Sequence, residues 1–330
     1  MFRKAALLVL ACWLSASAFG QTARHFTFHY AVMVRNPKPG ARLRLWIPLA
    51  HSGPYQKVRI LGLHCDLPCR KAMEPVHGNH LLYASALRAT APEYRFAIDY
   101  EVVRKEHVAL VGGRPVVHQA RLAQGVLARY LRPDRLVPTT GVPAQIASAQ
   151  IAGLRTPLER ARALYDYVLH NMRYDKSGTG WGRGDVLYAC DAKKGNCTDF
   201  HSLFISLARS QGIPARFEIG FALPDERRAG NILGYHCWAD FYLPGVGWVP
   251  VDISEAWQQP ARREYFFGAH DASRVQFTLG RDLILSPRQD GPPLNYFVYP
   301  YVEMNGHEYG NVSSDFSFAD VRSTSAGVGK

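Results

Sequence analysis

The helix predicted by residues 195–214 is the feature that most constrains how this chain can fold. The stretch reads GNCTDFHSLFISLARSQGIP, and its apolar residues recur at i, i+3, i+4, i+7 and i+8, which is one face of a helix. Asn196 is suited to cap the start of this helix, and Gly212 and Pro214 end it. Cys197 therefore lies in the first turn of the helix.

A thiol in the first turn of a helix is placed for reaction. The unpaired backbone N–H groups and the helix dipole stabilise a thiolate there, which lowers the thiol pKa. The same N–H groups could hold an oxyanion. A structural thiol gains nothing from this position, so we interpret Cys197 as a nucleophile.

Two alternating segments after this helix supply a base and a carboxylate. Residues 234–243 read GYHCWADFYL and residues 248–254 read WVPVDIS, and the turn PGVG between them predicts a β-hairpin. Pairing through that turn joins residues whose numbers sum to roughly 488–491, which places Asp252 beside His236. Alternation sends Cys237 to the other face, where a buried, inert thiol is expected.

These residues predict a Cys-His-Asp triad, in which His236 takes the thiol proton and Asp252 orients the imidazole. Two alternatives remain open. His201 follows Cys197 by four residues on the same helical face, so it is a second candidate base. A disulfide between Cys190 and Cys197 would inactivate the enzyme until it is reduced, and we call this possibility a redox lock.

A metal site is a third alternative for the same residues. It would group Cys190, Cys197, His236 and Cys237, but alternation sends the last two side chains to opposite faces of their strand. We therefore expect no metal and no organic cofactor.

The first 20 residues predict a secretory signal peptide. A charged start at Arg3 and Lys4 precedes a short apolar run, and Ala16-Ser17-Ala18 suits cleavage. A lipoprotein anchored at Cys12, or a core helix, are the alternative interpretations. No second apolar run is long enough to cross a bilayer. We expect an exported protein, periplasmic or secreted, without a transmembrane segment.

The rest of the chain divides into two parts and a tail. Residues 21–112 alternate between short strands and Pro/Gly turns, which predicts an antiparallel β-sandwich. Residues 113–322 predict the catalytic domain with a C-terminal extension, and residues 323–330 a disordered tail. In the sandwich we expect a local disulfide between Cys65 and Cys69, with a zinc site that includes His64 as the alternative.

Residues 175–196 predict a glycine-bearing loop that leads directly to Cys197. Such loops often shape the site beside them. We expect Trp181, Asn196 and Trp238 to contribute to a substrate groove or an oxyanion site. For Trp181, a purely structural place in the domain surface is the alternative.

At this point a resemblance to a known family adds to the prediction. The segments GNCTDFHSLFISLARSQGIPARFEIGF, GYHCWADFYLPGVGWVPVDISEA and YDKSGTGWGRGD resemble the bacterial exported branch of the transglutaminase-like superfamily, over roughly residues 156–257. FTLGRDLIL and LNYFVYPYVE resemble the C-terminal extension of the same proteins. The resemblance implies an α+β, papain-like core in which Cys197 is the nucleophile, His236 the base and Asp252 the third member.

The expected function is acyl transfer from amide or peptide carbonyls. Family members cleave amides, cross-link by transamidation, or only bind, and we favour hydrolysis of a protein, peptide or cell-wall peptide. A calcium-dependent enzyme of animal type is disfavoured, because the sequence lacks a D-x-D-x-D-G loop. The formal net charge of +12 is spread along the chain, which suits anionic envelope polymers and does not indicate nucleic-acid binding. The oligomeric state is not predicted.

Overall fold

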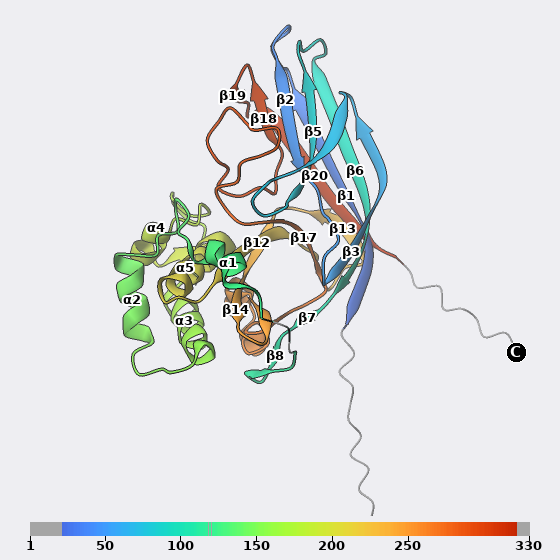
Figure 1. The fold of residues 1–330 in the computed structure, drawn as a ribbon. Helices are drawn as coiled ribbons and strands as arrows, with labels where there is room; N and C mark the ends of the chain where they lie inside the picture. Colours follow the sequence, from blue (N-terminus) through green and yellow to red (C-terminus); the bar gives the residue numbers. More distant parts are fainter. Residues whose placement is uncertain (1–21, 118, 120, 322–330) are drawn as a thin grey trace, which may run out of the picture.

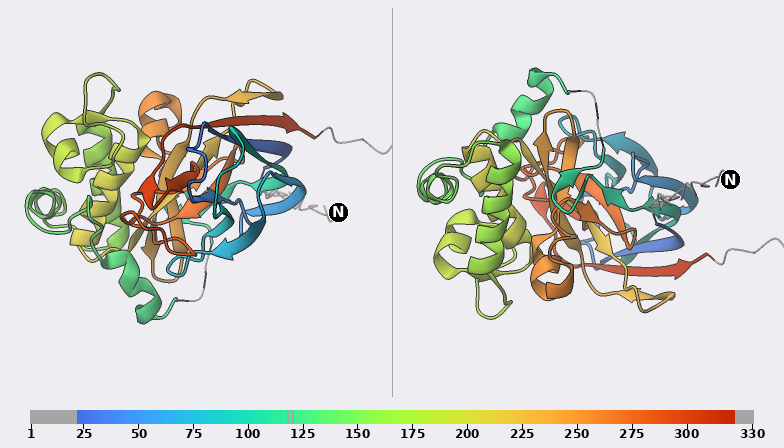
Figure 2. Two further views of the ribbon diagram at one scale, coloured as in Figure 1. Left: turned by 90° about the horizontal axis from the view of Figure 1, so that it is seen from above. Right: turned by 90° about the horizontal axis from the view of Figure 1, so that it is seen from below.

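The computed structural model describes residues 22–117, 119 and 121–321. The predicted signal peptide, including Cys12, and the predicted tail at residues 323–330 lie outside these residues. The described chain forms three layers: helices, a four-stranded sheet and a β-sandwich (Figure 1). The views from above and below show the same order, with the helices and the sandwich at opposite ends (Figure 2). The predicted α+β class is confirmed.

The sandwich consists of two five-stranded antiparallel sheets. The first has the order β13-β20-β1-β6-β3, and the second has the order β19-β18-β2-β5-β4. Their bounds are β1 (Ala23–Arg35), β3 (Gln56–Cys65), β6 (Glu93–Lys105), β13 (Ala229–Ile232) and β20 (Val312–Asp320); β2 (Leu43–Pro48), β4 (Cys69–Met73), β5 (His80–Ala86), β18 (Tyr301–Met304) and β19 (His307–Glu308). Alternate residues of β1 are buried, as the period of a half-covered strand requires. Besides strands from residues 21–112, the sandwich therefore uses β13, β18, β19 and β20 from the part of the chain predicted as the catalytic domain and its extension.

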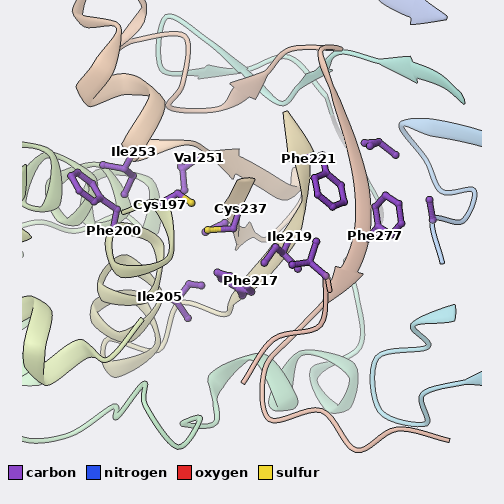
Figure 3. Packing of buried hydrophobic residues seen from close by; sticks show 14 of the residues in the cluster. Cys197, Phe200, Ile205, Phe217, Ile219, Phe221, Cys237, Val251, Ile253 and Phe277 are labelled. Carbon is purple, nitrogen blue, oxygen red and sulfur yellow. The ribbon is translucent and has the colours of Figure 1, made fainter. Parts of the chain in front are cut away.

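The central sheet has the antiparallel order β15-β14-β12-β17 and separates the helices from the sandwich. Phe200 and Ile205 pack on its helical side, whereas Phe221 and Phe277 lie on the side that faces the sandwich (Figure 3). The ring centroids of Phe28 and Phe221 are 5.3 Å apart, which joins the first sandwich sheet to the central sheet. Its strands are β12 (Ala215–Ala222), β14 (His236–Leu243), β15 (Gly247–Val251) and β17 (Arg274–Leu279).

The helical layer centres on α5, whose side chains are almost all buried. Its neighbours are α2, α3, α4 and α6, and Thr156 and Glu159 form a capping box at the start of α3. The bounds are α2 (Val142–Gln150), α3 (Pro157–Asn171), α4 (Val186–Ala192), α5 (Cys197–Ser210) and α6 (Ile253–Gln258). None of the helices in the described residues is long and apolar enough to cross a membrane.

Short elements complete the chain. They are β7 (His107–Val108), β8 (Leu110–Val111), β9 (Arg114–Pro115), α1 (Gln124–Leu127), η1 (Ala128–Leu131), β10 (Arg173–Tyr174), β11 (Lys194–Gly195), η2 (Pro260–Arg262) and β16 (Ala269–His270). The predicted loop at residues 175–196 contains α4, which the sequence pattern did not show. The Asp185 side chain caps this helix by accepting hydrogen bonds from the amides of Leu187 and Tyr188.

Candidate active site

Cys197 begins α5, as the sequence pattern predicts. The Oδ1 atom of Asn196 accepts a hydrogen bond from the amide of Thr198 at 2.9 Å, and Asp199 completes a capping box. Cys197 exposes only 2 % of its surface. The nucleophile candidate therefore sits at a helix start that is both rigid and shielded from water.

His236 and Asp252 meet across the hairpin of β14 and β15. The observed register pairs Asp240 with Pro250, within the predicted range, so the hairpin prediction is confirmed. Asp252 follows β15 directly and caps α6. Its Oδ2 atom lies 2.8 Å from Nε2 of His236. Since Nε2 is held by the carboxylate, the other ring nitrogen is left for a second partner.

The pKa values of Cys197 and His236 shift in opposite directions. Burial by itself raises the pKa of the Cys197 thiol, but interactions with Cys237 and His236 outweigh burial and hold this pKa well below its usual value. Burial by itself lowers the pKa of His236, but the Asp252 carboxylate and Cys197 outweigh it and hold that pKa well above its usual value. The two groups therefore favour a thiolate beside an imidazolium.

Arg274 is a site residue that the sequence reasoning missed. Its Nη1 atom donates to Oδ2 of Asp252 at 3.0 Å, and its side chain is buried. Burial raises the pKa of Asp252, but the charges of His236 and Arg274 and the hydrogen bond from His236 lower it further than burial raises it. Arg274 is the first residue of β17, and β17 pairs with β12. The triad contact therefore depends on strand pairing, and no local sequence pattern near Arg274 indicates it.

His201 does not occupy the position of the base. Its Nε2 atom accepts a hydrogen bond from the amide of Ile253 at 3.0 Å, and its Nδ1 atom lies 3.7 Å from Sγ of Cys237. Burial lowers the pKa of His201 to about 4. A neutral imidazole with both nitrogens engaged holds the start of α6 in place beside Asp252.

The glycine-bearing segment before α5 is tied to the helix start by Asp199. One carboxylate oxygen accepts from the amides of Gly182 and Asn196 at 2.7 and 2.9 Å, and the other accepts from the amide of Gly184 at 2.9 Å. Gly184 has a φ of +60°, and a Cβ atom there would lie 2.9 Å from Cγ2 of Thr198. The segment therefore packs closely over the first turn of α5.

The three predicted groove residues have different environments. Asn196 is buried, and its Nδ2 atom donates to the hydroxyl of Tyr235 at 3.0 Å. Trp181 is half-buried, and its indole N–H donates to the carbonyl of Gly178 at 3.1 Å. Trp238 is fully buried, and its indole N–H donates a hydrogen bond to Oε2 of Glu218 at 2.7 Å. The expectation that Trp238 lines a groove is wrong, because a side chain without exposed surface cannot contact a bound substrate.

The cysteines separate into one pair and three thiols. Cys65 and Cys69 form a disulfide. Cys190, Cys197 and Cys237 are free in the structure, so the redox lock between Cys190 and Cys197 is not formed there. Within the described ranges, the one group of His, Cys and acidic residues spaced for a metal does not include Cys197.

Comparisons with known proteins agree with this architecture. The profile of the transglutaminase-like superfamily matches residues 144–253, a segment that contains Cys197, His236 and Asp252. An uncharacterized protein of Haemophilus influenzae is 27 % identical over 329 residues, covering 85 % of each chain. The structure of a cysteine protease candidate from Cytophaga hutchinsonii superposes with a TM-score of 0.60 at 17 % identity, covering 92 % of this chain and 93 % of that one. At this identity, the superposition shows a common fold.

Proposed function

Because residues 144–253 form a domain of the transglutaminase-like superfamily, we propose that this protein is an exported thiol acyl-transfer enzyme. Cys197 is the nucleophile, His236 the base and Asp252 the group that orients it. The observation that carries the proposal is the 2.8 Å contact between His236 and Asp252, together with the opposite pKa shifts of Cys197 and His236. Substrates are proteins, peptides or cell-wall peptides with an accessible amide carbonyl.

In the first half of the reaction, the Cys197 thiolate attacks the carbonyl carbon and a C–S bond forms. The amides of residues 198–200 already donate to Asn196, so the backbone N–H of Cys197 itself is the candidate donor to the oxyanion that develops. The His236 imidazolium then gives its proton to the leaving nitrogen, and the C–N bond breaks. Asp252, held by Arg274, keeps the imidazole in its orientation and stabilises its cation throughout.

In the second half, a water molecule or an amine resolves the thioester. His236, now neutral, takes the proton from the incoming nucleophile, and the C–S bond breaks to restore the thiolate. We favour water, because an exported enzyme meets water in unlimited excess over amines. The Cys65–Cys69 disulfide supports the export part of the proposal, since such bonds persist in oxidising compartments.

The test compares Cys197→Ser with Cys190→Ser, a matched change at a half-buried cysteine of the preceding helix. Both variants are assayed for cleavage of a fluorogenic peptide library, for ammonia release and for incorporation of a labelled amine. We expect Cys190→Ser to keep activity and Cys197→Ser to lose it by a factor of 10³ or more, as loss of a covalent nucleophile requires. Equal activity of Cys197→Ser and wild type would refute the proposal.

The products decide the reaction outcome. Cleavage or ammonia release without amine incorporation indicates a hydrolase, and amine incorporation indicates a cross-linking enzyme. Saturable binding of a peptide or envelope polymer without turnover, equal in both variants, would indicate a binding module instead.

A further inference from the structure

A second cluster of ligand-type side chains lies on the reverse face of the central sheet. His107 of β7, Asp240 of β14 and His270 of β16 each offer one atom, and these three atoms lie within 4.8 Å of one another. The three residues are almost completely buried, with 3 %, 1 % and 1 % of their surface exposed. Asp240 alternates with Phe241, which packs against α5, so the cluster faces away from Cys197.

Four polar atoms of this cluster have no partner in the described part of the chain. Nε2 of His107, Oδ1 of Asp240 and both ring nitrogens of His270 are buried without a hydrogen bond. A buried polar atom without a partner is destabilising, and native proteins rarely keep several together. Four such atoms in one place indicate that a bound species completes the cluster.

The second carboxylate oxygen of Asp240 is already engaged. Arg216 donates to Oδ2 of Asp240 at 2.9 and 2.7 Å, and its Nη2 atom lies 2.8 Å from Oε1 of Glu218. This arrangement fixes the carboxylate through Oδ2 and leaves Oδ1 without a partner. Burial lowers the pKa of both His107 and His270 well below the usual value, so each ring carries a free lone pair.

We propose that His107, Asp240 and His270 form a zinc-binding site. Two imidazole nitrogens and one carboxylate oxygen are a ligand set that zinc prefers, with a fourth position left open. A cavity of about 180 Å³, which His107 and His270 line together with Arg104, has room for that fourth ligand.

Arg104 indicates the chemistry of the fourth ligand. Its Nε atom is also buried without a partner in the described residues. Its Nη1 atom donates only to the amide oxygen of Gln56, at 3.3 Å. A hydroxide or other small anion bound to zinc would accept from this guanidinium and offset the charge of the ion.

The site joins three separate parts of the chain. His107 lies just after the long sandwich strand β6, His270 follows the α6 region, and Asp240 is four residues beyond His236 on β14. Trp238 lies between the two sites, with its ring centroid 5.6 Å from His270 and 6.0 Å from His236. Since His236, Trp238 and Asp240 alternate along one face of β14, the zinc ion would fix the same strand face that carries the catalytic histidine.

The experiment measures zinc in the full chain after treatment with EDTA, loading with Zn²⁺ alone and gel filtration. Cys197→Ser is the background, so that zinc on the reactive thiolate is not counted. We expect one zinc per chain, its loss in His107→Gln and His270→Gln, and its retention in the control His64→Gln, whose histidine is exposed. Co²⁺ in place of Zn²⁺ should give visible bands without a thiolate-to-cobalt charge-transfer band.

A second measurement does not depend on the folding of the variants. At a hundredfold excess over its dissociation constant, Zn²⁺ should raise the Tm of the EDTA-treated Cys197→Ser chain by about 5 °C. An unchanged Tm with no retained zinc, or zinc retained equally by all variants, would overturn the proposal and leave water molecules as the occupants of the cluster.

Discussion

The reactivity of Cys197 tests the thiolate–imidazolium pair most directly. The change is His236→Gln, which removes the titratable ring but keeps a side chain of similar reach. Asp252 is not left unpaired in this variant, because Arg274 still contacts its Oδ2 atom at 3.0 Å. The variant should therefore fold, and its difference from wild type reports on His236 alone.

The expected size of the effect follows from ionisation. An ordinary thiol with a pKa of about 8.5 is only about 0.3 % ionised at pH 6, so a fully formed thiolate has roughly 300-fold more of the reactive species. A thiolate of lower basicity is intrinsically slower, and for a thiol that is fully ionised at pH 6 this loss is about 30-fold. At pH 6, wild type should thus react about tenfold faster than His236→Gln.

The assay is the rate of iodoacetamide labelling from pH 5 to 9, followed by mass spectrometry of the Cys197 peptide. Cys190 is an internal reference in the same chain, because burial raises the pKa of its thiol. The Cys190 peptide should be labelled only at high pH in both proteins. Identical pH profiles for Cys197 in wild type and His236→Gln would show that no ion pair forms and would refute the reasoning.

Three further predictions concern stability. Arg274→Met should lower the free energy of unfolding in urea by about 1.5–3 kcal/mol, because Asp252 keeps its contact with His236 but loses the hydrogen bond from a buried guanidinium. The pKa of His201 is about 4 in the folded protein and about 6.5 in an unfolded chain, so its contribution is complete above pH 6.5 and is lost as the pH falls toward 4. When the pH falls from 6.5 to 5, the free energy of unfolding of His201→Gln should therefore decrease by about 2 kcal/mol less than that of wild type. In thermal unfolding, Gly184→Ala should destabilise the protein by about 1–3 kcal/mol more than Gly153→Ala. Both glycines have a positive φ, but only a Cβ atom at residue 184 would collide with neighbouring side chains.

Each prediction has a contradicting result. Unchanged urea stability of Arg274→Met would show that the guanidinium does not compensate Asp252. Parallel pH profiles for His201→Gln and wild type would show that His201 is not held neutral. Equal costs for the two glycine substitutions would mean that the segment before α5 is not closely packed.

The site was predictable where the chemistry is local in sequence. The cap at Asn196, the apolar period of α5 and the turn between β14 and β15 each lie within a few residues, and together they place Cys197, His236 and Asp252. The alternation of β14 also predicts that Cys237 turns away from the face of Asp240. It does not predict that Cys237 contacts the first turn of α5. The hydrophobic repeat of a helix or of a strand shows which face is buried, but not which residues of the two elements meet.

The remaining features depend on contacts between distant parts of the chain. Arg274 reaches Asp252 only because β17 pairs with β12, and the sequence near Arg274 has no motif that reveals this pairing. The same holds for His107 and His270, which look like isolated histidines until their short strands pair. The strand β20 alternates like many others, and nothing in its composition shows that its partner is β1.

The pairing of β1 with β20 has a consequence for how the molecule folds. β1 lies between β6 and β20, and Arg24 contacts Asp320 across 296 residues of sequence. Closing so long a chain segment carries a large entropic barrier, so the last step of folding should be slow. Until the C-terminal segment arrives, the nine residues of β1 that pair with β20 form an unpaired edge, which is a template for aggregation. Truncation before β20 should therefore cause aggregation even though the catalytic residues remain.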